Sequence, residues 1–260
     1  MRRLFLVIGL ISLLSINCWA YEDFFGRPTL EETKKQDWFL NSLYDGKYSL
    51  CYMMIDENGW FTDEIRNIKE LKELINQSEK EIVIPIFPTV YVPSRLDKQY
   101  YDTILKSDIK PRDKVLVIGA GSGSDAWVAW FKSQTLIYTI EINPMAIANT
   151  YATAALAGFR VKQILGDIRD VSLPKDFSNF DFVLWNMPFV REQDIIKKCY
   201  HDGDDGSILK SFLSLLPSLL KKNGQAIIMN TKHAEKFINF PNSIIEGEGD
   251  GMVYIISNSK

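Results

Sequence analysis

The chain has 260 residues, of which 46% are hydrophobic and 24% are charged, and its formal net charge at pH 7 is −3. This is the composition of an ordinary globular protein with enough apolar residues for a core. The acidic balance and the lack of a long basic run argue against duplex nucleic acid as an obligate partner, and favour a protein or small-molecule partner over structured RNA.

The first 20 residues have the layout of a secretory signal peptide. Arg2 and Arg3 precede the apolar run "LFLVIGLISLLSI", and the small residue Ala20 stands before Tyr21. The apolar run is short for a membrane span. We predict cleavage after Ala20 and export to the periplasm or the medium. An uncleaved N-terminal membrane anchor is the alternative, and the two arginines favour export of the rest of the chain in either case.

Residues 21–95 are predicted to form a small α+β N-terminal extension, a hairpin plus a helix. Strand composition over 47–55 is followed by the turn sequence "DENG", and a return strand is expected to begin at Trp60. Apolar residues recur at helical spacing over 62–78, which predicts an amphipathic helix there. Residues 81–94 read as extended chain interrupted by prolines.

The second predicted domain, residues 96–260, alternates strands with helices. Strands are expected over 114–120, 135–142, 160–167, 180–189 and 225–230. Helices are expected over 124–133, 144–158 and 206–224, and a closing hairpin over 243–257. This order predicts an α/β fold with a doubly wound, mostly parallel, seven-stranded Rossmann-like sheet, whose antiparallel strand lies at or near one end.

A glycine turn follows the first strand of this series, in the sequence "VLVIGAGSGSDAW". In an open α/β sheet, ligands bind at the carboxyl ends of the strands, so Gly119, Ala120, Gly121 and Gly123 are candidate cofactor-binding residues. Glycine permits the backbone to approach a ligand closely. A dinucleotide fingerprint would place its third glycine at position 124, where this chain has Ser124, which disfavours a nicotinamide oxidoreductase.

Acidic residues end the next two strands. The carboxylate of Glu141 can accept hydrogen bonds from vicinal ribose hydroxyls, although dinucleotide-binding domains place an acid similarly. Asp167, after the third strand, can accept from an adenine amino group while Ile168 covers the ring. Together with the glycine turn, these residues predict a site for an adenosyl cofactor.

The sequence "NMPF" follows the fourth strand, at Asn186 to Phe189. The side-chain oxygen of Asn186 and the backbone carbonyl before Pro188 can accept two hydrogens from a planar amine. Those bonds favour a pyramidal nitrogen whose lone pair can attack, and Phe189 can stack on the target group. The predicted catalytic residues are therefore Asn186, Pro188 and Phe189, and no strong base is required.

These motifs resemble those of a known family. The glycine spacing G-x-G-x-G is similar to motif one of the class I S-adenosylmethionine-dependent methyltransferases, and "NMPF" resembles the Asn-x-Pro-aromatic motif of those that act on planar or amide nitrogens. The resemblance covers about residues 85–257 and is to the small-domain type, which includes release-factor glutamine methyltransferases and ribosomal-RNA guanine methyltransferases. It implies S-adenosyl-L-methionine as cofactor, bound beside Asn186, and methylation of an amide or exocyclic amine nitrogen.

Two other functions remain open. Because S-adenosylmethionine is not expected outside the cytoplasm, the export signal favours a non-catalytic cofactor-binding or interaction protein with the same fold. The glycine turn also resembles that of polyamine synthases, which transfer an aminopropyl group, but that family typically has aspartate where this chain has Asn186. No pair of His and Cys has metal-ligand spacing, so no metal is expected.

Overall fold

The computed structural model describes residues 49–56, 59–65, 81–87, 89–187, 206–238, 244–246 and 251–258. The predicted signal peptide, together with Pro188 and Phe189, lies outside these ranges. Export, with its membrane-anchored alternative, therefore stays a prediction.

The central sheet has seven strands in the order β6-β5-β4-β7-β8-β10-β9. β4 pairs in parallel with β5 on one side and β7 on the other, whereas β10 is antiparallel to both β8 and β9. This confirms the mostly parallel sheet with its antiparallel strand near one end. The strands are β4 (Val115–Ile118), β5 (Ile137–Glu141), β6 (Val161–Leu165), β7 (Phe180–Asn186), β8 (Leu220–Thr231), β9 (Ile244–Glu246) and β10 (Gly251–Ser257).

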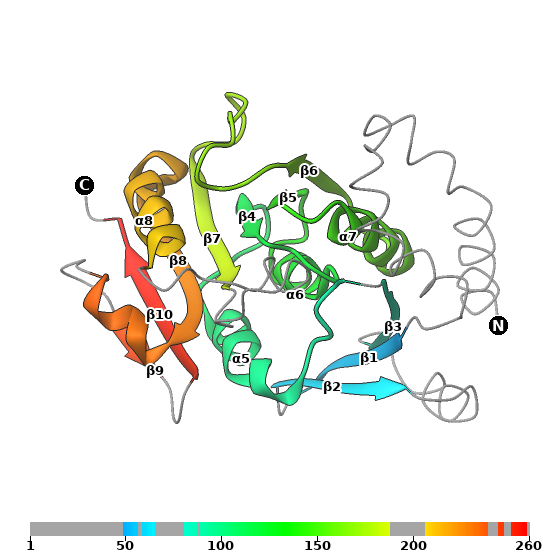
Figure 1. The fold of residues 1–260 in the computed structure, drawn as a ribbon. Helices are drawn as coiled ribbons and strands as arrows, with labels where there is room; N and C mark the ends of the chain where they lie inside the picture. The colour runs from blue at the N-terminus through cyan, green and yellow to red at the C-terminus, as the bar shows by residue number, and fades with distance from the viewer. Residues whose placement is uncertain are drawn as a thin grey trace, which may run out of the picture.

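Helices cover both faces of the sheet, as a doubly wound fold requires. The helices are α5 (Lys98–Lys106), α6 (Ser124–Ser133), α7 (Pro144–Ala157) and α8 (Ser207–Leu219), with short 3-10 turns at Arg95–Asp97 and Lys232–Lys236. Successive residues of β4 alternate between the faces. Val115 and Val117 join the core formed with α5, α6 and α7, while Leu116 and Ile118 pack with α8. Figure 1 shows this arrangement, with α8 to the left of β7 and with α6 and α7 to its right.

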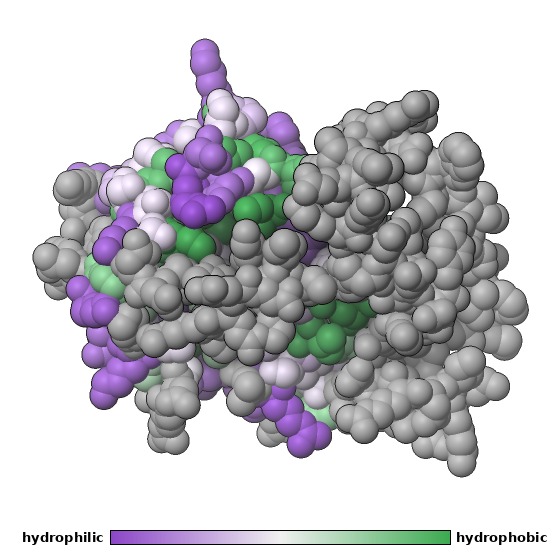
Figure 2. All heavy atoms as spheres, in the orientation of Figure 1, coloured by the Kyte–Doolittle hydropathy of each residue, from purple (hydrophilic) through white to green (hydrophobic). Residues whose placement is uncertain are grey.

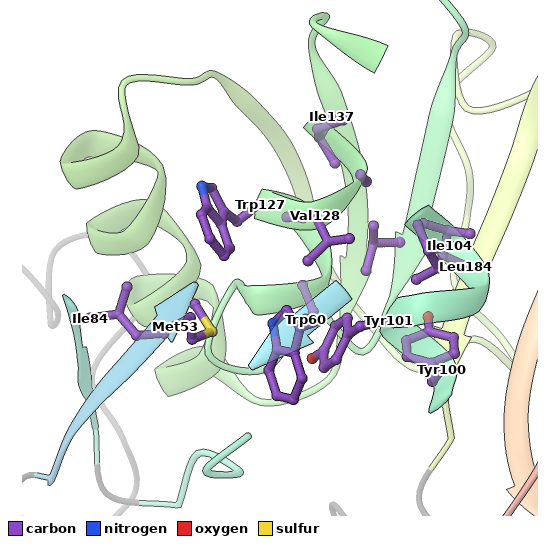
Figure 3. Close-up of a cluster of buried hydrophobic side chains, with 14 of the residues drawn as sticks. Met53, Trp60, Ile84, Tyr100, Tyr101, Ile104, Trp127, Val128, Ile137 and Leu184 are labelled. Atoms are coloured by element: carbon purple, nitrogen blue, oxygen red, sulfur yellow. The ribbon is translucent and has the colours of Figure 1, made fainter. Parts of the chain in front are cut away.

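A second sheet has three strands in the order β2-β1-β3, and its strands are β1 (Ser49–Asp56), β2 (Gly59–Ile65) and β3 (Glu81–Ile86). Its buried side chains belong to the same core as α5, α6 and α7. Trp60 of β2 packs on Tyr101 of α5 with ring centroids 4.2 Å apart, and Figure 3 shows the pair beside Met53. The small sheet is therefore part of the core that supports the large one.

The helix predicted to begin at residue 62 was wrong over its first four residues. Thr62 pairs with Met53, and Ile65 pairs with Leu50, so residues 62–65 complete β2. Burial there alternates with a period of two, because Trp60 and Thr62 are buried while Phe61 is exposed. That alternation is the strand signal which the helical spacing further along the chain obscured. Residues 66–78 lie outside the described ranges.

The helix predicted over 206–224 ends earlier than expected, at Leu219. Leu220 already has extended backbone angles (φ −83°, ψ 146°) and pairs with Phe180 of β7. Gly224, which we read as the end of the helix, lies inside β8. A Cβ on Gly224 would stand 2.9 Å from the carbonyl oxygen of Phe180, so glycine is needed there for close approach of two strands.

No helix among the described residues is long and apolar enough to cross a membrane. Figure 2 shows hydrophilic side chains over much of the described surface on the face that it presents, next to smaller hydrophobic areas. Two large apolar side chains in the described ranges are exposed at strand tips of the central sheet. They are Ile142, which follows β5 and is 49% exposed, and Leu165, at the end of β6.

Candidate functional site

The glycine turn between β4 and α6 has a backbone that only glycine adopts readily. Gly119, Gly121 and Gly123 have φ values of 62°, 53° and 84°. An ideal Cβ on Gly121 would meet only the carbonyl oxygen of Gly119, at 3.8 Å, whereas one on Gly123 would lie 2.9 Å from Cβ of Thr153. Gly121 therefore leaves space for a ligand, and Gly123 allows α6 to pack against α7. The side chain of Ala120 is buried in the core, so only its backbone faces the turn.

Polar side chains of α7 hold the carbonyl groups of this turn. Oγ1 of Thr150 donates to the carbonyl of Gly121 at 3.2 Å, and Oγ1 of Thr153 donates to that of Ser122 at 2.6 Å. Nδ2 of Asn149 also donates to Ser122, at 3.1 Å. Our sequence analysis missed these three residues. In the sequence they are polar residues within a mostly apolar helix, and in the structure all three side chains are fully buried.

Asn149 also ties the small sheet to the turn. Its Nδ2 donates to the carbonyl of Pro85 at 2.8 Å, and its Oδ1 accepts from the backbone N–H of Phe87 at 2.7 Å. A single buried amide thus joins the end of β3, α7 and the glycine turn.

Glu141 ends β5 and points toward the glycine turn. Its Oε2 accepts from the backbone N–H of Gly121 at 3.0 Å, and its Oε1 accepts from that of Asn143 at 2.9 Å. Desolvation raises the pKa of the Glu141 carboxyl, and the backbone hydrogen bonds oppose this rise. A carboxylate offers roughly four acceptor positions, so Glu141 retains capacity for a ligand hydroxyl.

The two residues predicted to hold an adenine ring have different surroundings. The guanidinium of Arg169 donates through Nε to both carboxylate oxygens of Asp167, at 2.9 Å each, and through Nη2 to Oδ2. This pairing lowers the pKa of the Asp167 carboxyl, so an adenine amino group would compete with Arg169 for its oxygens. Ile168 is buried against the α8 face of the core. Ile142, which our sequence analysis missed, is the more exposed apolar side chain, directly after Glu141.

Asn186 lies at the end of β7 and is half-buried. Its Nδ2 donates to Oδ1 of Asp97 at 3.0 Å, across 89 residues of sequence. No group among the described residues donates to Oδ1 of Asn186. One N–H of the side chain is therefore bonded inside the protein, and its acceptor oxygen is available.

Asp97 is fully buried at the start of α5. Its Oδ2 accepts from the backbone N–H of Ser94 at 2.7 Å and from the hydroxyl of Tyr91 at 3.0 Å. Desolvation raises the pKa of its carboxyl, and these hydrogen bonds act in the opposite direction. The sequence analysis did not identify Asp97, because nothing in the local pattern of "PSRLDKQ" marks a partner so far along the chain.

Asp125, in the first turn of α6, points into the protein. Its Oδ1 accepts from the hydroxyl of Tyr101 at 2.5 Å, and its Oδ2 accepts from that of Tyr100 at 3.4 Å. Burial raises the pKa of the Asp125 carboxyl to about 7. Trp127 and Trp185 are both buried in the core. Asp125 is thus held by two tyrosines of α5, and the two tryptophans are part of the core.

Met187 continues from Asn186 with its side chain buried. Its backbone N–H donates to the carbonyl of Met229 at 3.0 Å, and its sulfur accepts from Nδ2 of Asn230 at 3.3 Å. The expected stacking role of Phe189 and the part played by Pro188 stay predictions. Within the described ranges, no group of three or more His, Cys, Asp or Glu side chains could hold a metal ion.

None of the protein-family models or curated proteins compared with the chain matches it. Solved structures do. The ribosomal protein L11 methylase from Lactobacillus delbrueckii subsp. bulgaricus superposes with a TM-score of 0.51 at 18% identity, over 66% of this chain and 82% of the other. The T. thermophilus 16S rRNA methyltransferase RsmC, solved with AdoMet and guanosine, superposes with a TM-score of 0.56 at 14% identity, over 68% of this chain and 47% of the other. The match thus spans less than half of the RsmC chain. The fold is that of the class I methyltransferases.

Proposed function

We propose that this protein is an S-adenosylmethionine-dependent methyltransferase that transfers a methyl group to an amide or exocyclic amine nitrogen. The observation that carries the proposal is the register in which β4 pairs with β5 and β7. Ile118 of β4 pairs with Ile140 of β5 and with Trp185 of β7. The next residue of each strand or turn, which is Gly119, Glu141 and Asn186 respectively, therefore stands at the same carboxyl edge of the sheet.

The residues at this edge fit the proposed cofactor. Gly121 leaves open the space that a Cβ would fill, and Glu141 retains acceptor capacity beside it for ribose hydroxyls. The exposed side chain of Ile142 can cover one face of an adenine ring, with Asp167 and Ile168 on the neighbouring strand end. The backbone of 119–123 would hold the methionine portion. When bound, S-adenosylmethionine supplies an electrophilic sulfonium methyl group.

In this proposal, Asn186 holds and orients the methyl acceptor. Its Oδ1 accepts one N–H of the target amine, and the backbone carbonyl of Met187 accepts the second. These bonds localise the nitrogen lone pair and direct it toward the methyl carbon, while Phe189 stacks on the planar group. Positioning and hydrogen bonding would contribute the rate enhancement, and the positively charged nitrogen would then lose its proton to solvent water.

The two structural neighbours are named for a ribosomal protein and for an rRNA, so the fold alone does not choose the acceptor. The acidic composition of this chain favours a protein or small-molecule acceptor over nucleic acid. The predicted export signal supports a second candidate, a non-catalytic protein that binds an adenosyl ligand or a partner outside the cytoplasm.

Calorimetric titration of the full chain with S-adenosylmethionine, S-adenosylhomocysteine and NAD tests the cofactor. We expect both adenosyl ligands to bind and NAD not to bind; binding of NAD alone would overturn the proposal. Tritium transfer from labelled S-adenosylmethionine to fractionated cell lysate then tests activity. Transfer by the wild type, with none by an Asn186→Ala variant that still binds S-adenosylhomocysteine, is expected. Adenosyl binding without transfer to any fraction would favour the non-catalytic candidate.

A further inference from the structure

We propose that Asp97 is a positioning residue that fixes the orientation of the Asn186 amide, so that Asn186 presents its carbonyl oxygen to the substrate as a hydrogen-bond acceptor. The inference rests on the proposed function for its catalytic consequence. The orientation itself can be measured whether or not the protein turns out to be an enzyme.

The chemistry of the two side chains determines the orientation. An asparagine amide is nearly symmetrical in shape, with an acceptor on one side and two donors on the other. An ionised carboxylate only accepts. The opposite orientation would place the Oδ1 atoms of Asn186 and Asp97 3.0 Å apart with no hydrogen between them. It would also leave a buried charge without one of its donors, which costs more than an ordinary lost hydrogen bond.

The surroundings of Asp97 keep it an acceptor. Its Oδ2 already receives the backbone N–H of Ser94 and the hydroxyl of Tyr91, so every polar contact described at this carboxylate is with a donor. The titratable groups that face Asp97 electrostatically are Tyr91, Tyr100 and Tyr101, together with Asp125 of α6. No cation is among them, so the hydrogen bonds from Tyr91, Ser94 and Asn186 stabilise the charge.

This arrangement has a consequence for the class of acceptor. With its NH₂ group turned toward Asp97, Asn186 presents Oδ1 to the site, and that oxygen binds a group that carries hydrogen. A primary amine or amide nitrogen satisfies this requirement with one N–H to Oδ1. An ionised carboxylate or a nitrogen without hydrogen would place a lone pair against Oδ1 and be rejected. The Asp97–Asn186 pair thus selects for N–H acceptors.

Replacement of Asp97 by asparagine tests the proposal, because the new amide can accept from Ser94 and Tyr91 in one orientation only. Its oxygen must face Ser94 and Tyr91, so its NH₂ must face Asn186. Asn186 would then turn its oxygen inward and present NH₂ at the site. We expect Asp97→Asn to bind S-adenosylhomocysteine within about twofold of the wild type, and to lower kcat for tritium transfer to the active lysate fraction by about 100-fold.

Asp102→Asn is the matched control. It makes the same substitution five residues away, and the remaining amide oxygen can still accept from the backbone N–H of Trp60. We expect it to keep kcat within about twofold of the wild type. An equal loss in both variants, or an unchanged kcat in Asp97→Asn, would overturn the proposal.

NMR of the full chain, with isotopically labelled asparagine, measures the orientation directly. The Asn186 side-chain signals are assigned by their loss in an Asn186→Ser variant. In the wild type, the chemical shifts of these NH₂ resonances should follow the titration of Asp97. In Asp97→Asn, they should move to the chemical shifts of a solvent-exposed amide. If the NH₂ chemical shifts change neither with pH nor in the Asp97→Asn variant, the proposed orientation is wrong. This result can be read even where no methyl transfer is found in any sample.

A Tyr91→Phe variant keeps the proposal testable if Asp97→Asn does not fold. Loss of the tyrosine hydroxyl removes one hydrogen bond to the charged form of Asp97 and so raises its pKa further. Methyl transfer and the Asn186 resonances should therefore change at a higher pH than in the wild type. If Asp97 has only a structural role, the pH profiles of methyl transfer and of the Asn186 resonances should be the same in Tyr91→Phe and the wild type. Such unchanged profiles would count against the proposal.

Discussion

The backbone N–H of Gly121 donates to the carboxylate of Glu141 at 3.0 Å, and this bond joins the glycine turn to the tip of the neighbouring strand. The same carboxylate accepts from Asn143 at the start of α7. Glu141 is therefore both a part of the folded turn and a candidate ligand of the cofactor ribose, and its substitution should affect both cofactor affinity and stability.

Glu141→Gln should bind S-adenosylhomocysteine at least about 10-fold more weakly than the wild type. The amide retains one acceptor oxygen, so one of the two backbone N–H partners and the ribose contact are lost together. Removal of a buried charge offsets part of the cost to folding, and we expect the free energy of unfolding to change by no more than about 2 kcal/mol. Calorimetry and urea unfolding measure the two quantities. Unchanged affinity would remove Glu141 from the site.

Alanine substitutions at two glycines of the turn should have different effects. Gly123→Ala places a Cβ 2.9 Å from Thr153 and should destabilise the fold by about 2–4 kcal/mol through clash and left-handed backbone strain. Gly121→Ala meets no such clash and should cost only about 1–2 kcal/mol, but it fills the space beside Gly119 and should abolish adenosyl binding. Thermal unfolding and calorimetry of both variants check this. Tight binding by folded Gly121→Ala would show that the cofactor does not approach there.

Asp125 should make stability depend on pH. Its pKa rises from 3.8 to about 7 on folding, so the folded state binds more protons than the unfolded state between these values. Its contribution to stability is therefore present in acid and is lost as pH rises from about 4 to about 7, with a slope of at most about 1.4 kcal/mol per pH unit. Asp125→Asn should remove that part of the slope. Denaturant unfolding at several pH values compares the two proteins, and identical profiles would contradict the prediction.

Alanine substitutions at Gly224 and Gly158 should reduce stability for different reasons. Gly224→Ala brings a Cβ within 2.9 Å of the Phe180 carbonyl oxygen and should cost about 1–3 kcal/mol by forcing β7 and β8 apart. At Gly158 an added Cβ meets no atom within 4 Å, and only the positive φ of 78° opposes it, so we expect about 1 kcal/mol from strain alone. Chemical denaturation gives both values, and a larger loss at Gly158 would show that strand spacing does not require Gly224.

The predicted export signal can be tested on the protein as expressed in its native host. Cleavage after Ala20 should leave Tyr21 as the first residue of the mature chain, found by N-terminal sequencing in the periplasmic or secreted fraction. Retention of Met1 in the membrane fraction would favour the anchored form, and retention in the cytoplasm would contradict export altogether.

Local patterns predicted the parts of the fold around the candidate site that depend on a few consecutive residues. The glycine turn is one example, because a buried strand, three glycines in left-handed conformation and a helix start follow one another within 20 residues. The helix expected over 144–158 is likewise α7, because a proline in the first turn and a glycine after the last turn are helix-end signals that are visible in the sequence.

Contacts between distant residues could not be predicted in this way. The partner of Asn186 lies 89 residues earlier, at the start of α5, where no local pattern marks it. The second part of β2, residues 62–65, was misread because its buried residues are few and a helical spacing begins inside it. Gly224 was misread because a glycine after a helix and a glycine between two close strands look the same in a single sequence.

Asn149 has one further consequence. Its side-chain amide makes hydrogen bonds with the backbone of Pro85, Phe87 and Ser122. The small sheet and the glycine turn therefore cannot move apart without breaking buried hydrogen bonds. An expression fragment trimmed to begin at residue 96 would leave that amide and the apolar side of α7 facing water, and the loop that we assign to the cofactor would lose one of its supports.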